Sequence, residues 1–153
     1  MNSSRIVAVV VGVALLPVVA LAQVWRVETT QDEFDGTLRT YLYQVGDDSQ
    51  LSAIVGCDGP FGTTLSLAPG PTAGWSVFEN GIVDLRFDDG RPVEVRFDDG
   101  DTILLWYGAD VGRLAAADTL TVRVNPFLAG LEVDTFSMHG FAEAMERAGC
   151  AVE

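Results

Sequence analysis

The 153-residue sequence contains no lysine, one histidine and two cysteines. A zinc site takes three or four nitrogen and sulfur ligands, and with His139 as the only imidazole the two cysteines do not indicate one. A nucleophilic side chain needs an adjacent base, and His139 lies just before the last expected helix, where a capping role is favoured. The Gly-x-Ser-x-Gly motif, the glycine-rich phosphate loops and the zinc signatures are absent as well. The sequence therefore predicts a protein that is not an enzyme and holds no cofactor.

Positive charge is also scarce. The sequence has nine arginines and 22 acidic residues, which gives a formal net charge of −13 at pH 7. If Arg5 is removed with an N-terminal leader, eight arginines remain and the net charge becomes −14. Such a surface repels nucleic-acid phosphates and anionic lipid headgroups. We therefore expect neither nucleic acid nor an anionic membrane surface as the partner.

The N-terminal segment, residues 1–22, combines one arginine, an apolar run, a proline and a final Ala-Leu-Ala. This order is typical of a secretory signal peptide that is cleaved after Ala22. An uncleaved membrane anchor is the alternative, but the apolar run is shorter than the ~20 residues that a membrane span needs. We expect a mature chain of residues 23–153 that forms one domain, is periplasmic or secreted, and has no stable membrane insertion.

The two cysteines are Cys57, in the middle of the chain, and Cys150, three residues from its end. Export would place both in a compartment where disulfides form, so we expect them to be bridged. Two separately buried thiols are the alternative. A bridge that closes a loop of ~90 residues would stabilise the fold by about 4 kcal/mol, because it restricts the unfolded chain.

Short runs of alternating apolar and polar residues, broken by glycine, proline and aspartate about every ten residues, predict a β-sandwich or barrel. The expected strands are residues 24–30, 39–45, 51–57, 63–67, 75–79, 82–87, 93–97, 102–107, 120–124 and 131–138. A short helix is expected at 110–117. Residues 140–148 place apolar side chains at i, i+3, i+4 and i+7, the pattern of an amphipathic helix, and Gly149 ends it. The predicted architecture is an antiparallel β-sandwich with a C-terminal helix docked by the disulfide.

Residues 83–90 and 93–100 nearly repeat each other, and both contain Arg-Phe-Asp-Asp-Gly. We interpret them as two strands that each end in an acidic turn. Paired residue numbers that sum to 180 oppose Arg86 to Glu94, whereas a sum of 178 suits Gly90 as the left-handed turn residue. We favour 180. With residues 102–107 as the third strand of a meander, the two acidic turns lie roughly 20 Å apart and cannot share a metal ion.

Two ligand sites remain as candidates. Asp98, Asp99 and Asp101 place three carboxylates in four residues, which predicts at most a weak calcium site, because the spacing and the distal glutamate of an EF-hand are missing. The tryptophans could form a sugar-binding platform, although packing in the core is favoured for each of them. They are Trp25, Trp75 and Trp106.

A family resemblance covers most of the mature chain. It rests on Trp25, the strand 51–57 that ends in cysteine, Arg-Phe-Asp-Asp-Gly-Arg-Pro at 86–92, Trp106, Phe-Ser-Met-His-Gly-Phe at 136–141 and the final Cys150. This order resembles the VasI/TagO-like group of small periplasmic accessory proteins encoded with type VI secretion systems. The resemblance implies a periplasmic, non-enzymatic protein whose two cysteines are joined, and it transfers no catalytic residue. The doubled acidic motif and the strong negative charge depart from that group.

Two functions are therefore expected as alternatives. The first is an exported interaction or accessory protein that binds another envelope or secreted protein, with a link to type VI secretion or to the cell envelope. The second is a small secreted module that binds calcium or carbohydrate.

Overall fold

The computed structural model describes residues 25–31, 33, 35–59, 62–100 and 102–150. The predicted signal peptide lies outside these residues, so its cleavage stays a prediction. The strands are β1 (Arg26–Gln31), β2 (Leu38–Val45), β3 (Leu51–Gly59), β4 (Gly62–Pro69), β5 (Ile82–Phe87), β6 (Val93–Arg96), β7 (Asp98–Gly100), β8 (Ile103–Tyr107), β9 (Thr119–Val124) and β10 (Glu132–Ser137), and the helices are α1 (Val111–Ala116) and α2 (Phe141–Arg147).

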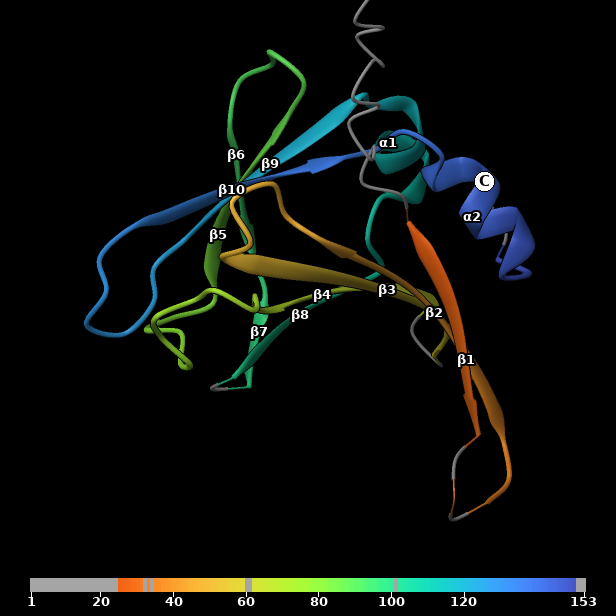
Figure 1. The fold of residues 1–153 in the computed structure, drawn as a ribbon. Coiled ribbons are helices and arrows are strands. Elements are labelled where there is room, and N and C mark those ends of the chain that lie inside the picture. Colours follow the sequence, from red (N-terminus) through yellow and green to blue (C-terminus); the bar gives the residue numbers. More distant parts are fainter. Residues whose placement is uncertain (1–24, 32, 34, 60–61, 101, 151–153) are drawn as a thin grey trace, which may run out of the picture.

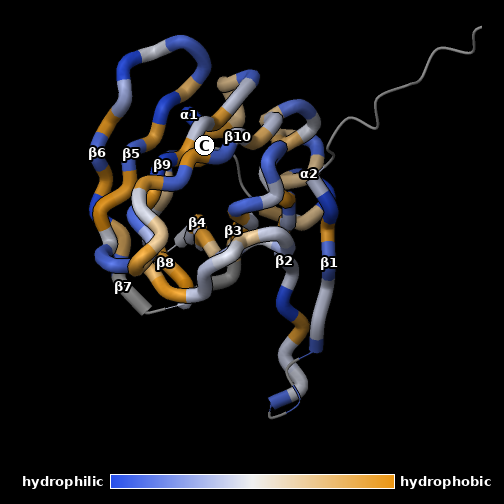
Figure 2. The backbone as a smooth tube through the Cα atoms, turned by 60° about the vertical axis from the view of Figure 1, so that its left-hand side comes forward, coloured by the Kyte–Doolittle hydropathy of each residue, from blue (hydrophilic) through white to orange (hydrophobic). Residues whose placement is uncertain are grey.

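The strands form two antiparallel sheets, ordered β1-β2-β3-β4-β8-β7 and β10-β9-β5-β6 (Figure 1). Alternation along each strand sends one set of side chains into the core between the sheets, including the fully buried Leu42, Val55 and Leu65 from one sheet and Leu85 and Val122 from the other. Hydrophobic stretches lie within the strands, whereas the turn between β5 and β6 is largely hydrophilic (Figure 2). The predicted mainly β fold with a C-terminal helix is confirmed.

The disulfide between Cys57 and Cys150 is also confirmed, with the two Cα atoms 5.6 Å apart. It joins β3 to Cys150, which lies three residues after the last residue of α2. Gly149, in the left-handed region at φ 75°, allows the chain to turn there. The apolar stripe of α2 is buried as its periodicity predicts, and Trp25 packs edge-on against Phe141 with ring centroids 5.0 Å apart. The helix is therefore fixed at both ends.

The favoured register of the β5–β6 hairpin is wrong. Asp84 lies opposite Glu94, so the paired numbers sum to 178. The prediction from charge failed because it considered only β5 and β6. On the other side of β5, Asp84 lies opposite Arg123 of β9 and forms an ion pair with it. In the turn, Asp88 rather than Gly90 takes the left-handed conformation, at φ 51°.

The predicted meander is wrong as well. After Phe97 the chain leaves the four-stranded sheet, and β7 pairs with β8 in the six-stranded sheet, where β8 also pairs with β4. The side chain of Phe97 is 2% exposed and lies against Trp106, with ring centroids 5.9 Å apart. It fills the core where the chain crosses between the sheets. The first Asp-Asp-Gly is thus a turn, whereas the second is the short strand β7.

The expected strand at residues 75–79 is also wrong, because only an isolated bridge between Phe78 and Pro126 is present there. Its backbone instead follows the end of β9, since Glu79 N–H donates to the Asn125 carbonyl at 2.8 Å. Phe78 is 4% exposed and packs against Trp75, whereas Val77 is exposed, so two of the three apolar side chains pack in or against the core although the segment forms no strand.

Candidate binding surfaces

The sequence-predicted candidates do not come together in one site. His139 is exposed and lies just before α2. Its backbone N–H donates to the Ser137 hydroxyl oxygen at 3.3 Å. Asp98 is an exposed residue of β7. Asp101 lies outside the described residues, so the calcium candidate stays a prediction. Among the residues that are described, no group of three or more histidine, cysteine and carboxylate side chains could hold a metal ion.

The tryptophans pack in or against the core, as favoured. Trp25 is 1% exposed, and its indole N–H donates to the Ser137 carbonyl at 2.9 Å. Trp75 and Trp106 are half-buried and each contacts a buried phenylalanine. They do not form a shared aromatic platform.

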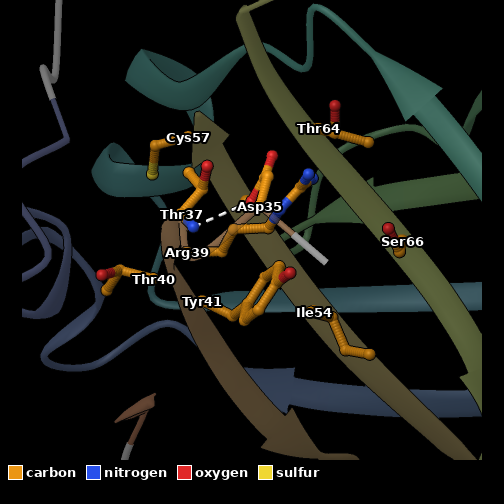
Figure 3. Close-up of a pocket in the computed structure, with 10 residues that line it drawn as sticks. Asp35, Thr37, Arg39, Thr40, Tyr41, Ile54, Cys57, Thr64 and Ser66 are labelled. Carbon is orange, nitrogen blue, oxygen red and sulfur yellow. Dashed lines mark hydrogen bonds between the residues drawn. The ribbon is translucent and has the colours of Figure 1, made fainter. Parts of the chain in front are cut away.

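A groove that the sequence did not reveal lies on the outward face of the six-stranded sheet (Figure 3). The strand registers align Tyr41 with Gly56, Gly56 with Thr64 and Thr64 with Tyr107, across β2, β3, β4 and β8. Leu42, Val55 and Leu65, each one position along the strand from a residue of this row, are fully buried in the core, so the row faces outward. We call the cavity of about 390 Å³ beside it the outer groove; its lining residues are Asp35, Thr37, Arg39, Thr40, Tyr41, Ile54, Gly56, Cys57, Thr64 and Ser66.

The floor of the outer groove is bare because Gly56 has no side chain. Of the atoms that the structure describes, a Cβ atom at Gly56 would meet only the ring of Tyr41, at 3.7 and 3.9 Å, which is ordinary van der Waals contact. Gly56 is not one of the glycines with positive φ. Neither packing nor backbone conformation therefore requires glycine at this position, although glycine weakens a strand interior.

The walls of the outer groove are polar. Tyr41 and Arg39 extend from β2 on one side, and Thr64 and Ser66 line the other side (Figure 3). Asp35, in the turn before β2, accepts a hydrogen bond from the Thr37 N–H at 2.8 Å. Hydrogen bonds from the Thr37 side chain and backbone hold the pKa of Asp35 below its usual value, so this carboxylate is ionised at neutral pH.

A second surface lies in the loop between β9 and β10, which projects from the body of the protein (Figure 1). Phe127, Leu128 and Leu131, here called the apolar tip, are 56%, 89% and 66% exposed. Leu128 has φ 63°, an unfavourable left-handed conformation for leucine. The segment before β5 fixes the backbone of this loop, because the Phe127 N–H donates to the Val77 carbonyl at 2.8 Å.

Both surfaces have weak signals in the sequence. Gly56 interrupts an otherwise regular strand pattern, and Pro-Phe-Leu-Ala-Gly-Leu at 126–131 is apolar where a turn should be polar. The groove needs the alignment of four strands, which sequence alone does not supply.

Within the part of the chain that the structure describes, no helix is both long and apolar enough to cross a bilayer. Disulfides form and persist mainly outside the cytoplasm. The Cys57–Cys150 bridge therefore fits a protein of a non-cytoplasmic compartment.

Comparison with known proteins gives a likeness in fold. No family model and no curated protein matches the chain. The crystal structure of invasion associated protein B from Bartonella henselae superposes with a TM-score of 0.54 at 15% sequence identity, covering 83% of this chain and 92% of that chain. At this identity the match supports a shared fold and nothing more, so the VasI/TagO resemblance stays a prediction.

Proposed function

We propose that this protein is an exported, non-enzymatic accessory protein that binds another envelope or secreted protein through the apolar tip. The observation that carries the proposal is the exposure of Phe127, Leu128 and Leu131 together on one projecting loop. Exposed apolar side chains that gather in this way mark interaction surfaces, whereas single ones are ordinary.

The tip is suited to binding on energetic grounds. Full burial of a leucine or phenylalanine side chain is worth about 1.5–3 kcal/mol, so three such side chains can anchor a partner. The loop is already ordered by its hydrogen bond to Val77, which reduces the conformational entropy that is lost on binding. An unfavourable backbone conformation at Leu128 supports a functional role, because such conformations persist mainly where they serve one.

Charge favours a protein partner over a membrane or a second copy. The mature chain carries a net charge of −14 when Arg5 is removed, so anionic lipids and other copies of the chain are repelled. A partner with an apolar pocket and a basic rim would be attracted. The VasI/TagO resemblance directs the search to components of the type VI secretion system and of the cell envelope.

Site-specific crosslinking tests this proposal. A photo-reactive amino acid at position 128 should give one discrete crosslinked product in exporting cells, and the same residue at Asp89, an exposed turn position, should not. The product should disappear when Phe127 and Leu131 are both changed to serine. Absence of a product at 128, equal products at both positions, or a product that contains two copies of this chain would overturn it.

A further inference from the structure

We propose that the outer groove binds a neutral carbohydrate chain, with the bare floor at Gly56 as the point of closest approach. This site is separate from the apolar tip and does not depend on it, because the two share no residue.

The first argument is the glycine itself. A strand-interior glycine often marks a place where a ligand or another backbone approaches closely. At Gly56 the structural reasons for glycine are missing, since the φ angle is not positive and a Cβ atom would meet no closer neighbour than Tyr41 at 3.7 Å. The irregular pairing of β3 with β4 begins only after Gly56. We conclude that glycine at this position serves to leave open space on the outer face of the sheet.

The second argument is the chemistry of the walls. The face of a sheet offers side chains only, because the backbone N–H and C=O groups of β3 are used by β2 and β4 on either side. A peptide laid on this face would leave its own backbone groups without partners, at a cost in free energy. Sugar hydroxyls both donate and accept, and Thr64 and Ser66 lie where they can be reached.

The third argument concerns size and charge. A volume of about 390 Å³ falls in the range of about 300–1,000 Å³ that is usual for small-ligand sites. Tyr41 supplies a ring that is apolar on its faces and polar at its tip, beside the open floor. Among the described residues that line the groove, one carboxylate, Asp35, and one guanidinium, Arg39, balance each other in charge. A neutral chain satisfies this lining, whereas an acidic chain would meet the repulsion of the whole molecule.

The test uses the mature protein and four hexasaccharides: cellohexaose, maltohexaose and hexa-N-acetylchitohexaose as neutral chains, and hexagalacturonate as the acidic chain. At millimolar concentration, at least one neutral chain should shift the amide resonances of residues 56 and 64 in a nitrogen-15 spectrum. Gly56→Val should weaken its binding at least tenfold by calorimetry, and Gly56→Ala should weaken it less, because more of the floor is filled by valine.

Gly74→Val is the matched control. Gly74 has no positive φ, and in the described part of the chain no atom lies within 4 Å of its Cβ position. The same change is thus made away from the groove and should leave binding unaltered. Melting temperatures of the three variants should stay near that of the parent, which separates lost binding from lost folding.

Several results would overturn the carbohydrate assignment. They are the absence of any shift with the neutral chains, equal weakening by Gly56→Val and Gly74→Val, tighter binding of hexagalacturonate, or shifts caused by an extended serine-rich peptide and by no oligosaccharide. None of these results bears on crosslinking at the apolar tip, so the two proposals can fail separately.

Discussion

The buried carboxylate of Asp134 gives the sharpest stability prediction. Asp134 lies in β10, is 1% exposed and accepts four backbone hydrogen bonds. One oxygen accepts from the N–H groups of Asp48 at 2.9 Å and Thr135 at 2.8 Å, and the other accepts from those of Gln50 and Leu51, both at 2.9 Å. The carboxylate thus ties the β2–β3 loop of one sheet to β10 of the other.

Asp134→Asn keeps the size and shape of the side chain but replaces one acceptor oxygen by an NH₂ group. Each carboxylate oxygen faces two N–H donors, so in either orientation the new amide group opposes two donors that then lack a partner. A hydrogen bond to a charged group contributes about 1.5–3 kcal/mol. Two lost bonds give an expected destabilisation of about 3–6 kcal/mol, a large part of the 5–15 kcal/mol that is typical of a whole domain.

Urea unfolding followed by tryptophan fluorescence measures this change. The control is Asp48→Asn, which alters an exposed side chain of the same loop and leaves its backbone donor in place; it should change the unfolding free energy by less than about 0.5 kcal/mol. If Asp134→Asn costs under about 1 kcal/mol at an unchanged denaturant slope, or no more than Asp48→Asn, then the four bonds do not stabilise the fold as argued.

Gly46 offers an independent check on the same cluster. A Cβ atom at Gly46 would lie 2.2 Å from Cγ of Asp134, so Gly46→Ala should destabilise strongly by forcing the carboxylate from its donors. In the double variant with Asp134→Ala the clash is removed. The two changes should therefore cost less together than the sum of their separate effects, a coupling that a double-mutant cycle measures.

Two further predictions concern the disulfide and calcium. Cys150→Ser should lower stability by about 4 kcal/mol, since the bridge closes a loop with a sequence separation of 93, and hydrogen exchange should show α2 loosening first; unchanged protection in α2 would contradict this. Calcium at 1 mM should leave the melting temperature unchanged, whereas a dissociation constant near 10 µM would add about 2.7 kcal/mol. A rise of several degrees that Asp99→Ala abolishes would establish the calcium site instead.

The sequence predicts those features that depend on one strand or one helix at a time. The burial of Leu85 and Phe87 follows from alternation along β5, and the burial of Phe141 and Met145 follows from the helical period of α2. The disulfide is predictable as well, because two cysteines in a chain that is predicted to be exported allow a single internal pairing.

The features that the sequence does not predict depend on partners far along the chain. The charges of β5 and β6 favoured a register with Arg86 opposite Glu94. Arg123 of β9, on the other side of β5, forms an ion pair with Asp84 and removes the preference for that register. The two copies of Asp-Asp-Gly are the same locally, and a buried phenylalanine precedes each of them, but the second copy pairs with β8 in the other sheet.

The same limit applies to the candidate site. The row that runs from Tyr41 to Tyr107 crosses four strands and spans most of the six-stranded sheet. Gly56 interrupts the pattern of its own strand, but the open space above it is recognised only from the neighbouring strands, where the ring of Tyr41 lies beside it. Composition and spacing carry no information of this kind.

The Asp134 cluster also connects the two proposed surfaces. The β2–β3 loop joins the two strands that carry Tyr41 and Gly56, and β10 begins directly after the apolar tip. Because Asp134 links this loop to β10, its loss should loosen both surfaces at once, whereas Gly56→Val acts on the groove alone. An Asp134→Asn protein that is still folded should therefore bind the oligosaccharide more weakly and crosslink less efficiently at position 128. Loss of one of these properties with full retention of the other would show that the two sheets position their surfaces independently.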